Sequence, residues 1–89
     1  MMPRLSRSQW LALRLIGEMV ETRGADCFTY DTLIRFWSGT RKPGIRANTL
    51  ERRLRELAAY GLVERRQKPG SRGFYYCLTV KGRQLLKIY

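Results

Sequence analysis

The stretch from Arg46 to Tyr60 constrains the fold most, because its apolar residues recur at the spacing of one helix face. These residues are separated by three, four, three and one positions: Ala47, Leu50, Leu54, Leu57 and Ala58. Gly61 follows, and glycine is a common residue just past the last turn of a helix. We therefore predict an amphipathic helix over 46–60 that packs on a core with one face and leaves the other face polar.

The pattern of a β-hairpin follows this helix. Residues 62–66 have the composition of a short strand with charges at its end, residues 67–73 contain one proline and two glycines, and residues 74–79 are rich in aromatic and β-branched residues. Such a sequence is typical of two strands joined by a loop. Thr79 is then placed to cap a short last helix that ends near Leu86.

The first half of the chain contains the signals of two further helices. Ser6 and Gln9 have the spacing of a capping box, which predicts a helix over 6–22. A short extended piece over 27–29 precedes a second helix that ends near Trp37. We therefore predict one domain over residues 1–89, mainly α with a small antiparallel sheet (α+β), in the order α-β-α-α-β-β-α.

The composition argues against most enzyme classes. The 89 residues include no histidine and only seven carboxylates, and the spacing of Cys27 and Cys77 matches no metal motif. We therefore expect no catalytic residue, no metal and no cofactor. The sequence also lacks a membrane-spanning stretch and the apolar core of a secretory signal, which predicts a cytoplasmic, nucleoid-associated protein without a membrane partner.

Positive charge gathers in the second half of the chain. The net charge is +11, and segment 41–72 contains ten basic residues and three acidic ones. The other 57 residues contain eight and four. Such a local excess attracts polyanions, and the phosphate backbone of nucleic acid is the commonest of them. Clustering on one helix and one hairpin favours DNA contact over a merely solvated surface.

Two strings of residues resemble winged helix-turn-helix transcription regulators. From Leu54 to Arg65 the chain follows the pattern Leu-x-x-Leu-x-x-x-Gly-Leu-Val-x-Arg that leads from helix to wing. From Leu78 to Leu85 it is similar to the Leu-Thr-x-x-Gly-x-x-Leu string that closes many such wings. The resemblance covers residues 6–88 and implies a winged helix with 46–60 as recognition helix. One departure is a turn before this helix that is longer than usual.

The resemblance and the charge pattern together predict the residues that contact double-stranded DNA. The recognition helix enters the major groove, and the wing loop 67–73 contacts the minor groove or the backbone. We expect Arg52 to contact guanine, Asn48 adenine, and Arg53 and Arg55 phosphates. The predicted contacts are Arg41, Lys42, Arg46, Asn48, Thr49, Arg52, Arg53, Arg55, Arg66, Lys68, Ser71 and Arg72.

The function that we predict is a sequence-specific transcription regulator, expected to be a repressor. One alternative is a DNA-binding accessory in replication, partition or excision of a mobile element. A second alternative is a winged helix that binds an acidic protein partner. The first two functions differ in where the binding sites lie on the DNA. The third differs from both in how steeply affinity for DNA falls with salt concentration.

The apolar arc of the first helix is wider than one core contact needs, so that this helix is either nearly buried or part of a homodimer interface. The residues predicted for that interface are Leu11, Ala12, Leu15 and Met19, with the C-terminal helix as a second contribution. Cys27 and Cys77 fall on strands that are neighbours in a winged helix, so they are candidates for a disulfide. Because cytosolic thiols are usually reduced, the sequence leaves their redox state open.

Overall fold

The computed structural model describes residues 4–40, 47–67, 69–70 and 73–88. Its elements follow the predicted order: α1 (Arg7–Arg23), β1 (Cys27–Thr29), α2 (Tyr30–Thr40), α3 (Ala47–Ala59), β2 (Val63–Gln67), β3 (Phe74–Leu78) and α4 (Val80–Ile88). The predicted α+β winged-helix architecture is confirmed. The second and last helices extend three and two residues beyond their predicted ends.

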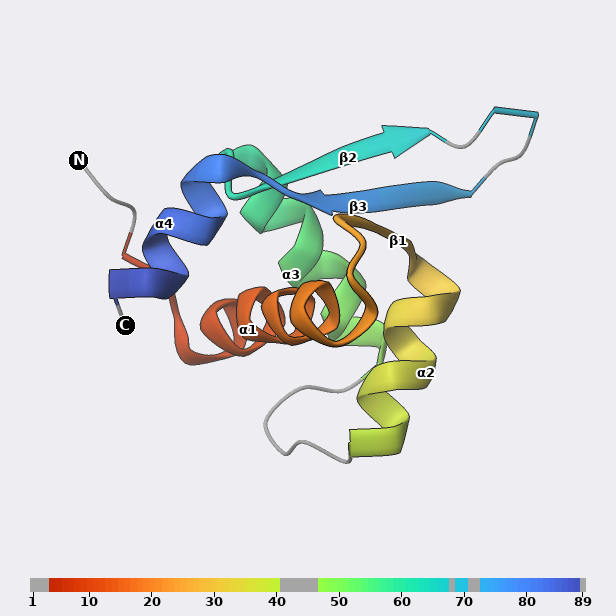
Figure 1. The fold of residues 1–89 in the computed structure, drawn as a ribbon, viewed down its shortest axis with the longest axis horizontal. Helices are drawn as coiled ribbons and strands as arrows, with labels where there is room; N and C mark the ends of the chain where they lie inside the picture. The colour runs from red at the N-terminus through yellow and green to blue at the C-terminus, as the bar shows by residue number, and fades with distance from the viewer. Residues whose placement is uncertain (1–3, 41–46, 68, 71–72, 89) are drawn as a thin grey trace.

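The three strands form one antiparallel sheet in the order β1-β3-β2. Within this sheet Cys27 lies opposite Cys77, and Val63 lies opposite Leu78. Figure 1 shows the sheet above α1 and α2. The β2–β3 hairpin extends past α2 at one end of the molecule, and α4 lies at the opposite end. We call this hairpin the wing. It projects beyond the helices, so its outer part is available to a partner.

The core lies between α1, α3 and the inner face of the sheet. Its largest fully buried side chains come from five elements and the turn that follows α3: Leu13, Leu15, Ile16, Met19, Leu33, Leu50, Leu54, Leu57, Leu62, Val63 and Tyr76. The three leucines of α3 are each 0% exposed. The periodicity that predicts this helix is therefore the pattern of its contact with the core.

The burial of α1 corrects the predicted dimer surface. Ala12, Leu15 and Met19 are at most 1% exposed, because they pack into the core of the same chain. A second subunit therefore has no access to them, and their assignment to an interface is wrong. Leu11 alone of the four is half-buried and reaches the surface. The wide apolar arc belongs to a helix that is nearly surrounded.

The ends of α1 and α3 are fixed by local hydrogen bonds. Ser6 and Gln9 form both bonds of the predicted capping box, with the Ser6 hydroxyl accepting from the Gln9 amide and the Gln9 side chain accepting from Ser6. At the end of α3, Gly61 has a φ of 76°. The Gly61 amide donates to Ala58 and the Leu62 amide to Leu57, which is the Schellman arrangement. Gly61 thus turns the chain directly from α3 into β2.

The turn that ends α3 is also the anchor of α4. The Thr79 hydroxyl is 2.9 Å from the Leu62 carbonyl oxygen and accepts from the Gly82 amide at 3.0 Å. Lys81 Nζ donates to the Tyr60 carbonyl at 3.0 Å. Gly82 packs so closely that a Cβ there would collide with the Leu62 carbonyl oxygen. The glycine of the Leu-Thr-x-x-Gly-x-x-Leu string therefore has a steric role.

A covalent bond and an ion pair fasten the outer face of the sheet. Cys27 and Cys77 are joined by a disulfide that links β1 to the central strand. Arg83 of α4 forms an ion pair with Asp26, the residue before β1. The short strand β1 is thus held at its first residue and at the residue before it. None of the described helices is long and apolar enough to cross a membrane.

Candidate nucleic-acid interface

The exposed face of α3 is the centre of the candidate interface. Arg52 and Arg55 are exposed on the side of the helix opposite Leu50, Leu54 and Leu57. Arg52 forms no hydrogen bond or ion pair with any described residue. Its guanidinium is therefore free to bind an external acceptor, and a planar fork of N–H donors fits phosphate or the edge of guanine.

Arg55 is held only weakly. Its guanidinium lies 3.2 Å from Glu51 one turn earlier, and the two side chains are 58% and 44% exposed. An exposed pair of this kind contributes little to stability. Breaking this pair therefore costs little, so the Arg55 guanidinium can bind an external anion, as its predicted phosphate contact requires.

Arg53 occupies a different environment from its two neighbours. Its Nη1 atom lies 2.5 Å from Glu56 Oε1, and its side chain is only 23% exposed. Arg53 Nε is buried and has no hydrogen-bond partner. The structure therefore turns Arg53 toward its own helix, although the sequence predicts it as a phosphate contact.

Glu56 connects α3 to the start of α1. The same Oε1 atom that binds Arg53 accepts a hydrogen bond of 2.9 Å from Gln9 Nε2. The hydrogen bond from Gln9, and then that from Arg53, hold the pKa of Glu56 below its ordinary value. Gln9 is in turn fixed by its bond from Ser6 and is 8% exposed. We call Gln9, Glu56 and Arg53 the α1–α3 clamp.

The wing presents charged side chains on both of its faces. Arg66 is exposed and lies 2.9 Å from Glu64, whose pKa it lowers through a hydrogen bond. The same contact raises the pKa of Arg66 above its usual value. Arg66 is thus present on the outer face of the wing, as a predicted DNA contact requires, with a carboxylate beside it.

Arg65 is a wing residue that the sequence analysis does not assign. Its guanidinium carbon lies 3.6 Å from the centroid of the Phe74 ring, within the range of a cation–π contact. Arg65 is half-buried on the same face of β2 as Val63. The sequence indicates this shared face, because residues two positions apart on a strand, such as Val63 and Arg65, point to the same side of the sheet.

Several predicted contacts lie outside the described residues. These are Arg41, Lys42, Arg46, Lys68, Ser71 and Arg72. The backbone of Asn48 belongs to α3, but its side chain is also outside the described part. Thr49 is described and half-buried. Among the described residues the structure therefore brings Arg52, Arg55 and Thr49 together on α3 and places Arg66 on the wing.

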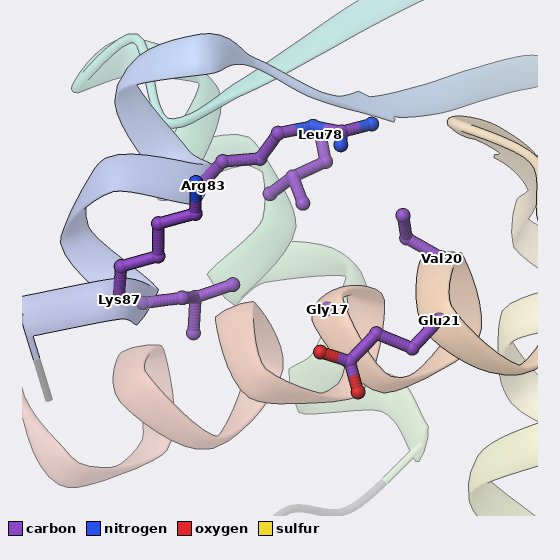
Figure 2. Close-up of a pocket in the computed structure, with 7 residues that line it drawn as sticks. Gly17, Val20, Glu21, Leu78, Arg83 and Lys87 are labelled. Atoms are coloured by element: carbon purple, nitrogen blue, oxygen red, sulfur yellow. The ribbon is translucent and has the colours of Figure 1, made fainter.

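A shallow groove lies between α1, α4 and the end of β3. It has a volume of about 280 Å³ and is bordered by Gly17, Val20, Glu21, Leu78, Arg83, Leu86 and Lys87. Figure 2 shows Glu21 on the α1 side and Arg83 and Lys87 on the α4 side. Gly17 allows the close approach of the two helices, since a Cβ there would lie 2.7 Å from Leu86 Cδ1. The groove is separate from the basic face of α3.

The family of the chain follows from its second part. A family model described as HxlR-like helix-turn-helix matches residues 34–89, which is more than half of the chain. The chain belongs to this family. The match includes α3, the wing and α4, so it covers the candidate interface of this HxlR-like protein and confirms the predicted winged helix-turn-helix.

A solved structure supports the same architecture. The HxlR-like chain is similar to a cysteine-to-serine mutant of MarR from E. coli, whose crystal structure is a complex with operator DNA. The TM-score is 0.66 and the identity 26%, over 94% of this chain and 52% of the MarR chain. The chain thus spans about half the length of that protein. No protein with a curated description matches it significantly.

Proposed function

We propose that this HxlR-like protein is a transcription regulator that binds double-stranded DNA at specific sequences. The observation that carries the proposal is the two-sided character of α3. Leu50, Leu54 and Leu57 are fully buried on one side, and Arg52, which pairs with no described residue, is exposed on the other. A helix of this kind fits the major groove, where each base pair presents a distinct pattern of donors and acceptors. The family and the DNA-bound MarR structure support the same function.

The two exposed arginines of α3 have different roles in this proposal. Arg52 contacts a guanine, because a bidentate guanidinium matches the two acceptors of that base. Arg55 leaves Glu51 for a phosphate, which fixes the position of the helix on the duplex without selecting a sequence. Asn48 and Thr49 lie one turn earlier on α3 and complete the predicted base-contacting surface.

The wing supplies the second contact. It projects beyond the helices (Figure 1), and Arg66 is exposed on β2. We propose that Arg66, together with Lys68, Ser71 and Arg72 of the loop, binds the backbone or the adjacent minor groove. The basic residues of the segment before α3, Arg41, Lys42 and Arg46, are proposed to add further phosphate contacts.

We further propose that the protein acts as a homodimeric repressor. Two copies double the number of base pairs contacted, and α4 lies at the opposite end of the molecule from the wing (Figure 1). The contact between the copies falls on the surface of α1 and α4, where Leu11, Val20 and Leu86 are half-buried. A dimer of this kind represses by occupying a promoter.

Sedimentation at micromolar concentration tests the oligomeric state. A monomer that binds single half-sites would refute the proposed dimer.

Selection from random duplex DNA followed by sequencing tests the proposed function. We expect an enriched motif, and a palindrome if the protein binds as a dimer. Arg52→Ala is expected to relax preference at one base position, at a cost of about 1–3 kcal/mol on the preferred sequence. Lys68→Ala is expected to weaken all sequences alike.

Arg35→Ala is the matched control for these variants. Arg35 is an exposed arginine on α2, so its removal changes the net charge by the same amount away from α3, the wing and the proposed dimer surface. Loss of base preference in Arg35→Ala as large as in Arg52→Ala would contradict the assignment. Sites that lie at replication origins rather than promoters would favour the accessory role. A weak salt dependence without duplex binding would favour an acidic protein partner.

A further inference from the structure

We propose that Glu56 determines how many phosphates α3 contacts, because it withdraws Arg53 from the DNA-facing surface. This inference rests on the proposed DNA-binding function and names a residue that tunes it. Glu56 itself carries the wrong charge to bind DNA. Its effect is exerted through Arg53, so it is a positioning residue.

The first step of the argument is the difference between three arginines on one helix. Arg52 is exposed and has no partner among the described residues, and Arg55 is paired with Glu51 at 3.2 Å in an exposed position. Arg53 is paired at 2.5 Å, is 23% exposed, and has a buried Nε atom. The sequence gives no reason to separate these residues, since all three arginines lie within four positions. In the structure the three arginines differ in the partner that each guanidinium group contacts.

The second step is that Glu56 is itself held from outside α3. Gln9 Nε2 donates to the same carboxylate oxygen that binds Arg53. The Gln9 side chain cannot easily rotate, because its own oxygen accepts from the Ser6 amide at 2.9 Å in the capping box of α1. The carboxylate is therefore fixed in place by two donors. Glu51 is held less firmly: its arginine partner, Arg55, lies on the same helix at 3.2 Å and both side chains are exposed, although the charge of Glu51 also reaches Tyr30 of α2, whose pKa is raised by burial and then by Glu51.

The third step is the consequence for phosphate binding. A surface pair such as Glu51–Arg55 opens readily, so Arg55 remains available to DNA. The α1–α3 clamp keeps Arg53 on its carboxylate, so wild-type α3 binds one phosphate fewer than its arginine content allows. Neutralising Glu56 leaves Arg53 without a charged partner. The flexible side chain of Arg53 then reaches a phosphate beside the major groove of the duplex.

The experiment compares Glu56→Gln with Glu51→Gln on one duplex that the wild type binds. Both substitutions remove one negative charge from α3, so the general gain in attraction is the same. Only Glu56→Gln opens the clamp. Each extra phosphate contact makes the slope of log K against log salt more negative by about 0.9. The affinity ratio of Glu56→Gln to Glu51→Gln is thus expected to fall about 3.5-fold between 50 and 200 mM salt.

Arg53→Gln completes the test. Combined with Glu56→Gln, it is expected to return the salt slope to that of wild type, and alone it is expected to leave the wild-type slope unchanged. Equal slopes for Glu56→Gln and Glu51→Gln would overturn the inference. So would a flatter slope for Arg53→Gln alone, which remains informative if Glu56→Gln fails to fold. If the wild type binds no duplex, the proposed function fails as a whole, which is a distinct result.

Discussion

Reduction of the disulfide between Cys27 and Cys77 is expected to remove a large part of the stability of the fold. The two residues are 50 positions apart, so the bond closes a long loop in the unfolded chain. In the chain-entropy model a loop of this length contributes about 4 kcal/mol. A domain of this size has a total unfolding free energy of about 4–13 kcal/mol. The reduced protein should therefore be marginally stable.

The native contacts of the two cysteines change little on reduction. Cys27 lies directly opposite Cys77 in the β1–β3 register, and Cys77 is 6% exposed. A reduced cysteine behaves as a small apolar residue, so Cys77 remains buried. The loss of stability thus comes mainly from the greater freedom of the unfolded chain.

Thermal and denaturant unfolding with and without a reductant measure this effect. We expect the Tm to fall by about 20 °C on reduction. The denaturant slope m should rise, because the unfolded chain without the cross-link exposes more surface. A Cys27→Ala/Cys77→Ala double variant is the control, and its Tm should be low and insensitive to reductant.

Two results would refute the reasoning. One is a Tm that differs by only a few degrees between the oxidised and the reduced protein. The other is a count of two free thiols in native protein that was never exposed to reductant. A low Tm in the double variant with an unchanged m would place the effect in the native state instead of the unfolded chain.

Two further substitutions test other features of the fold. Gly82→Ala is expected to lower the free energy of unfolding by about 1–3 kcal/mol in denaturant unfolding, because the new Cβ collides with the Leu62 carbonyl. Helix propensity alone predicts that the variant is more stable by about 1 kcal/mol, so a stabilised variant would contradict the close packing at Gly82. Glu56 has a pKa lowered by Gln9 and Arg53, so its stabilising effect is complete above its ordinary value of 4.5 and is lost as the pH falls through the lowered pKa. Glu56→Gln should therefore lose less stability than wild type between pH 7 and pH 3, and equal losses would refute the network.

Much of the fold follows from local signals in the chain. The leucine spacing of α3, the glycine after it and the capping box of α1 each predict an element that the structure contains. These signals are short in range, since a cap or a turn depends on neighbours within a few residues. The pairing of β1 with β3 follows instead from the winged-helix resemblance, which places the strands of Cys27 and Cys77 side by side.

The candidate site is less predictable, because it depends on contacts between distant residues. Gln9 and Glu56 are 47 positions apart, and nothing in the local sequence pairs them. The withdrawal of Arg53 therefore could not be foreseen from its position on the helix. Periodicity also shows that α1 is apolar on most sides without saying what covers it. This is why the sequence predicts Ala12 and Met19 at a subunit interface although the core of the chain covers them.

The strand order β1-β3-β2 leaves two edges, and both are protected against association with other strands. An edge strand presents unpaired amide and carbonyl groups that invite a strand from another molecule. β1 has only three residues, and four of the five in β2, Glu64, Arg65, Arg66 and Gln67, are charged or polar. If two wings approached edge to edge, their arginines would come together and repel each other. This repulsion opposes aggregation through the wing and keeps the hairpin available to a duplex.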